Sequence, residues 1–181
     1  MTHLTRLVVL ATLILCASNA AAQTEPEVPA TAPARVPHLR PGDPLATTVL
    51  RAAAATSPTV VGLLADLEQT DVIVIIVTGR LPGRVNGHTR IVTAAGGARY
   101  LRIVLKIPNA TERLIATLGH ELCHAMEIAG MPDVRDEASF AAAYRRVGVA
   151  MARDGVFETD AAVQTGNRVA REVAAWMRTP R

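Results

Sequence analysis

The residues best suited to chemistry lie in one short stretch, His120-Glu121-Leu122-Cys123-His124. Residues four apart on an α-helix share a face, so His120 and His124 are predicted to offer two imidazole nitrogens to one metal ion. Glu121 lies about 100° further round such a helix, beside the ion and not bonded to it. With Zn²⁺ as the ion, Glu121 would take a proton from a metal-bound water and pass it to a leaving amine. The pattern therefore predicts hydrolysis of an amide bond.

Two histidines do not complete a metal site, so a third ligand is expected among the acidic residues. We favour Glu158, because along a predicted C-terminal helix it shares the apolar face that should pack inward. Asp160 falls on the solvated side of that helix. Glu127 lies on the face of His124 but a turn beyond the gap between the histidines, and is expected to hold a histidine or an arginine. The full set of acidic candidates is Glu127, Asp133, Asp136, Glu137, Glu158 and Asp160.

Other side chains near the motif have two interpretations each. Tyr144 or Tyr100 is a candidate donor to a developing oxyanion, or a tyrosine of the core or of a strand. His88, in a Gly-rich loop, is a candidate substrate contact or a solvated turn residue. Cys123 points away from the metal face and is a candidate nucleophile or, as we favour, a small buried apolar residue. Gly119 is expected to let the motif helix approach a sheet closely.

The motif is expected within a helix that runs from about residue 109 to Gly130. Asn109 and Glu112 have the spacing of a capping box, and Gly130 precedes Pro132, as is typical of a helix end. Its predicted apolar stripe is Leu114, Leu118, Leu122 and Ala125. Further helices are predicted over 45–53, from Ser57-Pro58 to Leu67, from Asp133 to Val147 and over 159–177.

Three strands are predicted between these helices. Val72–Val77 is a run of aliphatic residues and is expected to be a central strand. Thr89–Ala94 and Arg99–Ile107 follow, and the second alternates apolar and polar residues as a half-exposed strand does. The fold class predicted is therefore α+β, with a small mixed or antiparallel sheet of about three strands packed against the motif helix and further helices.

The N-terminal 44 residues differ in composition from the rest. Arg6 precedes a short apolar run and small residues follow, which predicts a signal peptide over 1–22 with cleavage near Ala22. Residues 23–44 are Pro-rich and predict an extended linker, and 45–181 form the metal-binding domain. We expect a secreted or periplasmic protein without a stable membrane anchor after signal removal, because the apolar run is shorter than the roughly 20 residues of a spanning helix.

Composition narrows the partners and the bonding. Loss of residues 1–22 would remove one Arg and no acid, so the formal net charge of +3 becomes +2. The basic residues are scattered and only 3% of residues are aromatic, so no nucleic-acid partner is predicted. Cys16 would leave with the signal peptide, and Cys123 would then lack a partner for a disulfide within the chain.

The predicted strand and helix with His120-Glu121-Leu122-Cys123-His124 resemble the catalytic half of zincin metallopeptidases. No Gly and third His follow His124 closely, so the chain is more similar to the branch whose third ligand is a Glu. That resemblance implies a peptide or protein substrate lying along strand 99–107 as a sheet edge. The wider pattern, with Thr70–Val74, Gly119–Leu122 and Phe157–Ala162, also resembles small uncharacterised secreted proteins of soil bacteria.

A rival hypothesis from another class stays open. The same residues would suit a non-catalytic secreted module, in which the metal ties the helix to its neighbours or the site is degenerate. The domain is small, which leaves little sequence for substrate pockets. A site closed by four protein ligands would favour this alternative, and an open position facing a groove would favour an enzyme.

Overall fold

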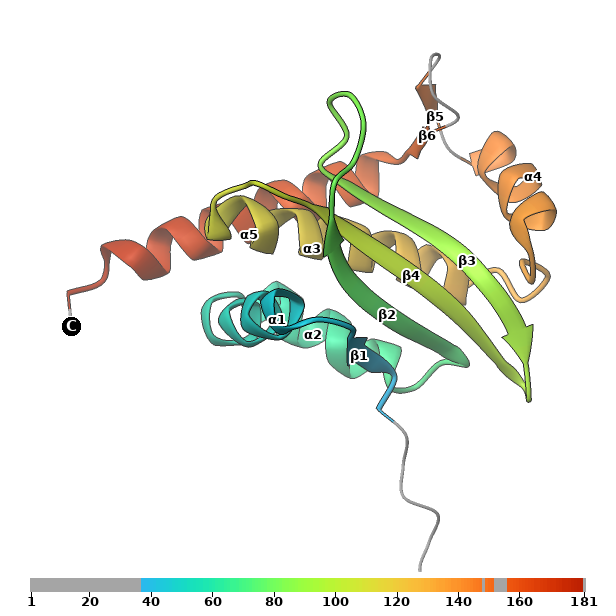
Figure 1. The fold of residues 1–181 in the computed structure, drawn as a ribbon, viewed down its shortest axis with the longest axis horizontal. Helices are drawn as coiled ribbons and strands as arrows, with labels where there is room; N and C mark the ends of the chain where they lie inside the picture. The colour runs from blue at the N-terminus through green and yellow to red at the C-terminus, as the bar shows by residue number, and fades with distance from the viewer. Residues whose placement is uncertain (1–36, 148, 152–155, 181) are drawn as a thin grey trace, which may run out of the picture. The chain divides into compact units, whose positions relative to one another are not determined.

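The computed structural model describes residues 37–147, 149–151 and 156–180. Within these ranges the chain forms five helices, one four-stranded mixed sheet and one two-stranded hairpin (Figure 1). The predicted α+β class is therefore confirmed, with four strands in the main sheet where about three were expected. The predicted signal peptide 1–22 and the first part of the predicted linker lie outside the described residues.

The main sheet has the strand order β1-β2-β4-β3. Its strands are β1 (Leu39–Pro41), β2 (Val72–Gly79), β3 (Gly87–Ala95) and β4 (Ala98–Lys106). β2 is parallel to β1 and to β4, whereas β3 is antiparallel to β4. The aliphatic run predicted as a central strand is thus paired on both sides.

The prediction that strand 99–107 is a sheet edge was wrong. β4 pairs with β2 along one side and with β3 along the other, and in the described part of the chain β3 is the edge next to it. Side-chain alternation was predicted correctly, since Leu101, Ile103 and Leu105 are fully buried. Alternation reports which face of a strand is covered but carries no information on whether its backbone is paired.

The folded region begins before the predicted linker ends. β1 lies inside the range 23–44, and it pairs with β2 in the register Leu39↔Val74. The amide of Val74 donates to the His38 carbonyl at 2.6 Å, and the amide of Gly42 donates to the Ile76 carbonyl at 2.7 Å. A proline-rich segment is compatible with this role, because an edge strand needs amide donors on one side only.

Two capped helices follow β1. α1 (Pro44–Thr56) begins after Asp43, whose carboxylate accepts from the Ala46 amide at 2.8 Å. α2 (Pro58–Leu67) begins after Ser57, whose hydroxyl accepts from the Val60 amide at 3.1 Å, as its sequence predicted. In the residues described, no single helix has the length and apolar character to cross a membrane. The helices α1 and α2 meet those criteria only when taken together, and the pair is bent by 113°.

The motif lies in α3 (Thr111–Ala129), which packs against β2, β3 and β4. The predicted apolar stripe is buried, and Gly130 follows the last turn as expected. The predicted capping box is absent, because the N-cap is Ala110 and makes no side-chain hydrogen bond. The amide group of Asn109 instead donates to the Lys106 carbonyl at 2.9 Å, which places Asn109 in the turn that leaves β4.

The C-terminal third contains α4 (Glu137–Val147), β5 (Val149–Met151), β6 (Val156–Glu158) and α5 (Asp160–Arg178). The hydrogen bonds at the start of α4 involve Asp136, whose carboxylate accepts from the Ser139 amide at 2.8 Å, and not the predicted Asp133. The β5–β6 hairpin was not predicted, since strands of three residues carry too few positions to show a period.

Gly119 lies where α3 and α5 cross. The prediction that it lets the motif helix approach the sheet was wrong. A Cβ added at Gly119 would lie 2.5 Å from Cγ2 of Val169 on α5. The missing side chain therefore allows α5, and not the sheet, to approach the motif helix. α5 is amphipathic, and its buried positions Ala162, Val169 and Val173 face the core.

We expect the substitution Gly119→Ala to destabilise the fold. Overpacking of a tight contact lowers the free energy of unfolding by about 1–3 kcal/mol, which exceeds the gain of up to about 1 kcal/mol for Ala over Gly in a helix. Gly62 in α2 provides the matched control, because a Cβ there would meet nothing within 4 Å. Urea unfolding should rank Gly62→Ala above the wild type and Gly119→Ala below it. Equal stability of the two variants would contradict the assigned contact.

Candidate metal centre

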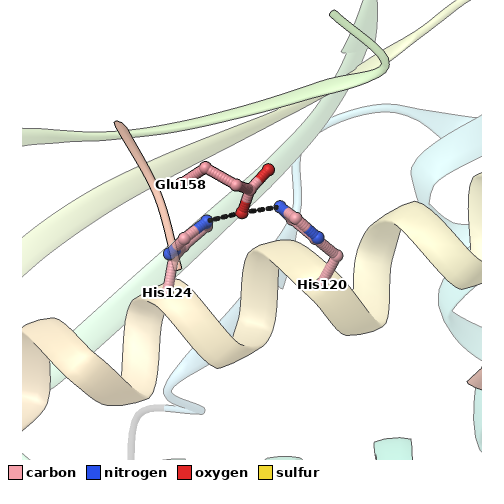
Figure 2. Close-up of side chains that lie close together, drawn as sticks. All are labelled: His120, His124 and Glu158. Carbon is pink, nitrogen blue, oxygen red and sulfur yellow. Dashed lines mark ion pairs between the residues drawn. The ribbon is translucent and has the colours of Figure 1, made fainter. Parts of the chain in front are cut away.

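The side chains of His120 and His124 on α3 and of Glu158 at the end of β6 bring three potential ligand atoms close together (Figure 2). Glu158 Oε1 lies 3.3 Å from His120 Nε2 and 3.5 Å from His124 Nε2. Two ligands that each lie about 2.1 Å from a tetrahedral ion are separated by about 3.4 Å. The two distances from Glu158 Oε1 match that separation, and all three ligand atoms lie within 4.8 Å of one another, which makes the three residues a candidate metal site.

The two histidines are placed by the helical repeat of α3. Their side chains project from the same face, and their ring centroids are 4.9 Å apart with the rings nearly perpendicular. Gly166 of α5 leaves room beside His120, since a Cβ at Gly166 would lie 3.1 Å from the Cβ of His120. The helix spacing and the close approach of α5 together fix the position of His120.

Glu158 reaches the histidines from the end of β6, and not from a helix face as predicted. Thr159 is the N-cap of α5, so Glu158 precedes the helix. The Thr159 amide donates to Glu158 Oε1 at 3.1 Å, and the Thr159 hydroxyl donates to Glu127 Oε1 at 2.6 Å. The N-cap thus links the end of β6 to α3, which holds Glu158 beside the histidines.

Glu127 contacts the side of His124 that faces away from Glu158. Its Oε2 lies 2.8 Å from His124 Nδ1 and accepts a hydrogen bond from the Tyr144 hydroxyl at 2.9 Å. A carboxylate on Nδ1 fixes the ring orientation and leaves Nε2 for a metal. Glu127 therefore has the contact with a histidine that its sequence position suggested, and its carboxylate is not a member of the three-ligand cluster.

The electrostatics of the cluster suit a cation. Burial acts against a charged His124, but its hydrogen bonds with Glu127 and Glu158 outweigh burial and raise its pKa to about 9. Burial lowers the pKa of His120. Burial opposes ionisation of Glu158, but hydrogen bonding to His124 and the charge of His120 keep its pKa below the usual value. The carboxylates of Glu127 and Glu158 therefore favour a positive charge beside His124, whether a proton or a metal ion supplies it.

Glu121 is buried next to the cluster. It is 4% exposed, and its Oε2 accepts a hydrogen bond from the Thr89 hydroxyl on β3 at 2.7 Å. Burial raises the pKa of Glu121 to about 7, although the hydrogen bond from Thr89 acts in the opposite direction. A carboxyl group with such a pKa can both accept and release a proton near neutral pH.

The remaining candidates lie outside the ligand cluster. Tyr144 is 1% exposed and donates to Glu127, which fits the interpretation as a core tyrosine better than that of an oxyanion donor. Asp160 is exposed in the first turn of α5. His88 is exposed near the start of β3 and lines the same cavity as the ligand cluster, so its interpretation as a substrate contact stays open. Burial raises the pKa of the Cys123 thiol, which disfavours the nucleophilic thiolate.

The cluster opens onto a cavity of about 1170 Å³. His120, His124, Glu158 and Glu121 all line it, together with apolar residues of α5 such as Ala170. Thr89, which lies beside Glu121, was not among the residues predicted from the sequence. A polar residue on the buried face of a strand was the available signal, since Thr89 and Ile91 alternate inward on β3.

Among the residues that the structure describes, the cluster supplies three protein ligands. Catalytic zinc sites typically have three protein ligands and an open fourth position, whereas structural sites have four. All three ligand residues line the cavity. No family model, curated protein or solved structure matches this chain.

Proposed function

We propose that this protein is a zinc-dependent hydrolase of peptide bonds, with a minimal zincin-like domain. The observation that carries the proposal is the convergence of His120, His124 and Glu158 on one point, with Glu121 next to them on the same cavity. Two imidazoles and one carboxylate form a ligand set suited to zinc. The contact of the Glu127 carboxylate with His124 Nδ1 also supports the proposal, because it orients the imidazole ring.

The residues have separate roles in the proposed reaction. When bound, zinc would supply a Lewis acid that polarises the peptide carbonyl and lowers the pKa of a water molecule. Glu121 accepts the proton of the attacking water and delivers it to the leaving amine. Its position on the cavity beside the three ligand residues supports both transfers. Glu158 and the histidines hold the ion, and the Tyr144–Glu127 contact keeps His124 oriented.

The sheet supports a zincin-like arrangement in which the peptide-binding edge is β3. The edge strand beside α3 is β3, which is antiparallel to β4. Gly87 and Thr89 of β3 line the cavity that contains the cluster. We place the peptide substrate along β3 and not along 99–107, since an unpaired strand edge can hydrogen-bond an extended peptide. Export by a signal peptide, to the periplasm or outside the cell, stays part of the proposal.

Metal analysis tests the central claim directly. Protein purified without chelators and supplied with Zn²⁺ should hold about one zinc per chain after removal of the excess. Hydrolysis of a mixed peptide library should appear with zinc, disappear with a chelator and return when zinc is restored. Absence of bound zinc after addition of the metal would overturn the proposal.

The ligand assignment predicts a ranking of zinc affinities. Glu127→Gln should weaken binding by roughly 10- to 100-fold, the range for residues that orient a ligand. Glu158→Ala should weaken it by a larger factor, because it removes a ligand atom. Competition titration with a chromophoric chelator measures both constants. A Glu158→Ala affinity equal to that of the wild type would exclude Glu158 as the third ligand and favour Glu127.

The alternative, a non-catalytic secreted metal-binding module, is supported by one observation. Glu121 is only 4% exposed, which restricts its access to a substrate. Stoichiometric zinc with no hydrolysis of any peptide would favour this alternative. A structure with zinc would add a second criterion, since a fourth protein ligand would close the site.

A further inference from the structure

We propose that Thr89 and Gly87 of β3 position the catalytic carboxylate of Glu121. The inference rests on the proposed function, and it adds two positioning residues outside the motif. Both residues belong to one strand and are separated by 32 or more positions from Glu121 in the sequence. Thr89 donates a hydrogen bond to one oxygen atom of the carboxylate. Gly87 has no side chain and so leaves room for the other oxygen atom.

Thr89 restrains one oxygen atom. Its side chain is 6% exposed, and its hydroxyl lies 2.7 Å from Glu121 Oε2 and 3.4 Å from the Glu121 main-chain carbonyl. The shorter contact makes the carboxylate the acceptor of the hydroxyl proton. A hydrogen bond to a charged acceptor is stronger than one between neutral groups, so it selects one side-chain orientation of Glu121.

Gly87 provides space for the other oxygen atom. A Cβ at Gly87 would overlap Glu121 Oε1 and would lie 2.6 Å from Cγ2 of Thr117 on α3. Gly87 is not among the glycines with positive φ, so its backbone does not require glycine. The reason for glycine at this position is the volume that Glu121 occupies. Gly87, Thr117 and Glu121 all line the cavity, so this contact lies at the wall of the proposed substrate site.

Thr89 lines the cavity, but its side chain is only 6% exposed and its hydroxyl contacts Glu121. Its loss should therefore affect the reacting carboxylate much more than substrate affinity. A misplacement of about 1 Å can lower a rate by roughly 100-fold. We therefore expect Thr89→Val to lower kcat by about 10- to 100-fold with KM changed by less than about twofold.

Four variants test the inference. Thr89→Ser keeps the hydroxyl and should restore most of the kcat lost in Thr89→Val. Gly87→Ala should lower kcat with Thr89 intact, because it displaces Oε1. Thr48→Val is the matched control, since Thr48 is exposed on α1, does not line the cavity and should keep the wild-type kcat. All rates are compared per zinc-loaded molecule, which removes effects of stability and of metal content.

Crystal structures of Thr89→Val and Gly87→Ala provide a readout that does not depend on hydrolysis. A changed side-chain orientation of Glu121 supports the inference even if the wild type proves inactive, in which case the proposed function fails alone. An unchanged Glu121 in both variants overturns the inference. So does a Thr89→Val kcat equal to that of the wild type, or a Thr89→Ser kcat no higher than that of Thr89→Val.

Discussion

Replacement of Glu121 by Gln is expected to lower the rate of peptide hydrolysis by about 10²- to 10⁴-fold, with zinc content unchanged. Gln has nearly the same shape, and its amide oxygen can still accept the hydrogen bond from Thr89 that the Glu121 carboxylate accepts at 2.7 Å. It cannot accept a proton from water at neutral pH. Glu121 is not one of the three ligand residues, so the metal site should persist. Steady-state kinetics with metal analysis of the same sample measures both quantities.

The matched control for this variant is Asp160→Asn. Asp160 is an exposed acid two residues from Glu158, so it reports the effect of removing one negative charge near the cluster. We expect unchanged hydrolysis and unchanged zinc affinity for this control. Full hydrolysis by Glu121→Gln would refute the catalytic role of Glu121. Loss of zinc from Glu121→Gln would instead show that Glu121 is needed to maintain the site.

The part of the site that lies on one helix could be predicted from the sequence. The interval of four residues between His120 and His124 determines their shared face, and the apolar stripe of α3 determines which face is buried. Both properties are local, because they depend only on the 3.6-residue repeat. The helix start was predicted less well, since Asn109 makes its hydrogen bond to the Lys106 carbonyl and does not cap α3.

Residues that meet through the fold were harder to predict. Glu158 was selected because it shares a helix face with apolar residues, yet it lies on β6, in front of the N-cap Thr159. Its place near the histidines depends on the β5–β6 hairpin and on the contact of Thr159 with Glu127. No periodic pattern indicates such contacts, because the partners are 32 positions apart in the sequence. The same reason explains why Thr89 was not recognised as a neighbour of Glu121.

Arg99 provides the clearest example of a long-range contact that supports the site. Its side chain is 1% exposed at the start of β4. The guanidinium donates to both carboxylate oxygens of Asp71, at 2.9 and 2.6 Å. It also donates to the carbonyls of Ile128 and Met131, each at 2.7 Å, and of Ala129 at 3.0 Å. Arg99 therefore caps the C-terminal end of the helix that carries the metal ligands.

Both the charge and the shape of Arg99 matter for this contact. The last carbonyls of a helix have no partner within the helix, and its C-terminal end carries a partial negative charge. A planar guanidinium can satisfy several of these carbonyls and a carboxylate at once, which a lysine ammonium cannot do with the same geometry. The last turn of α3 also contains Glu127, which holds His124. Loss of Arg99 should therefore affect both the fold and the metal site.

Replacement of Arg99 by Met is expected to lower the free energy of unfolding by about 3–5 kcal/mol. Met fills part of the same volume, but the buried carbonyls lose their donor and Asp71 loses its cation. Urea denaturation of the zinc-free protein measures this loss without a contribution from bound metal. Arg99→Lys should recover part of the stability, because it restores the charge without the planar donor set. Arg90→Met is the matched control, since Arg90 is exposed on β3 and should change the stability by less than about 0.5 kcal/mol. An Arg99→Met protein as stable as this control would show that the helix end is satisfied by other donors.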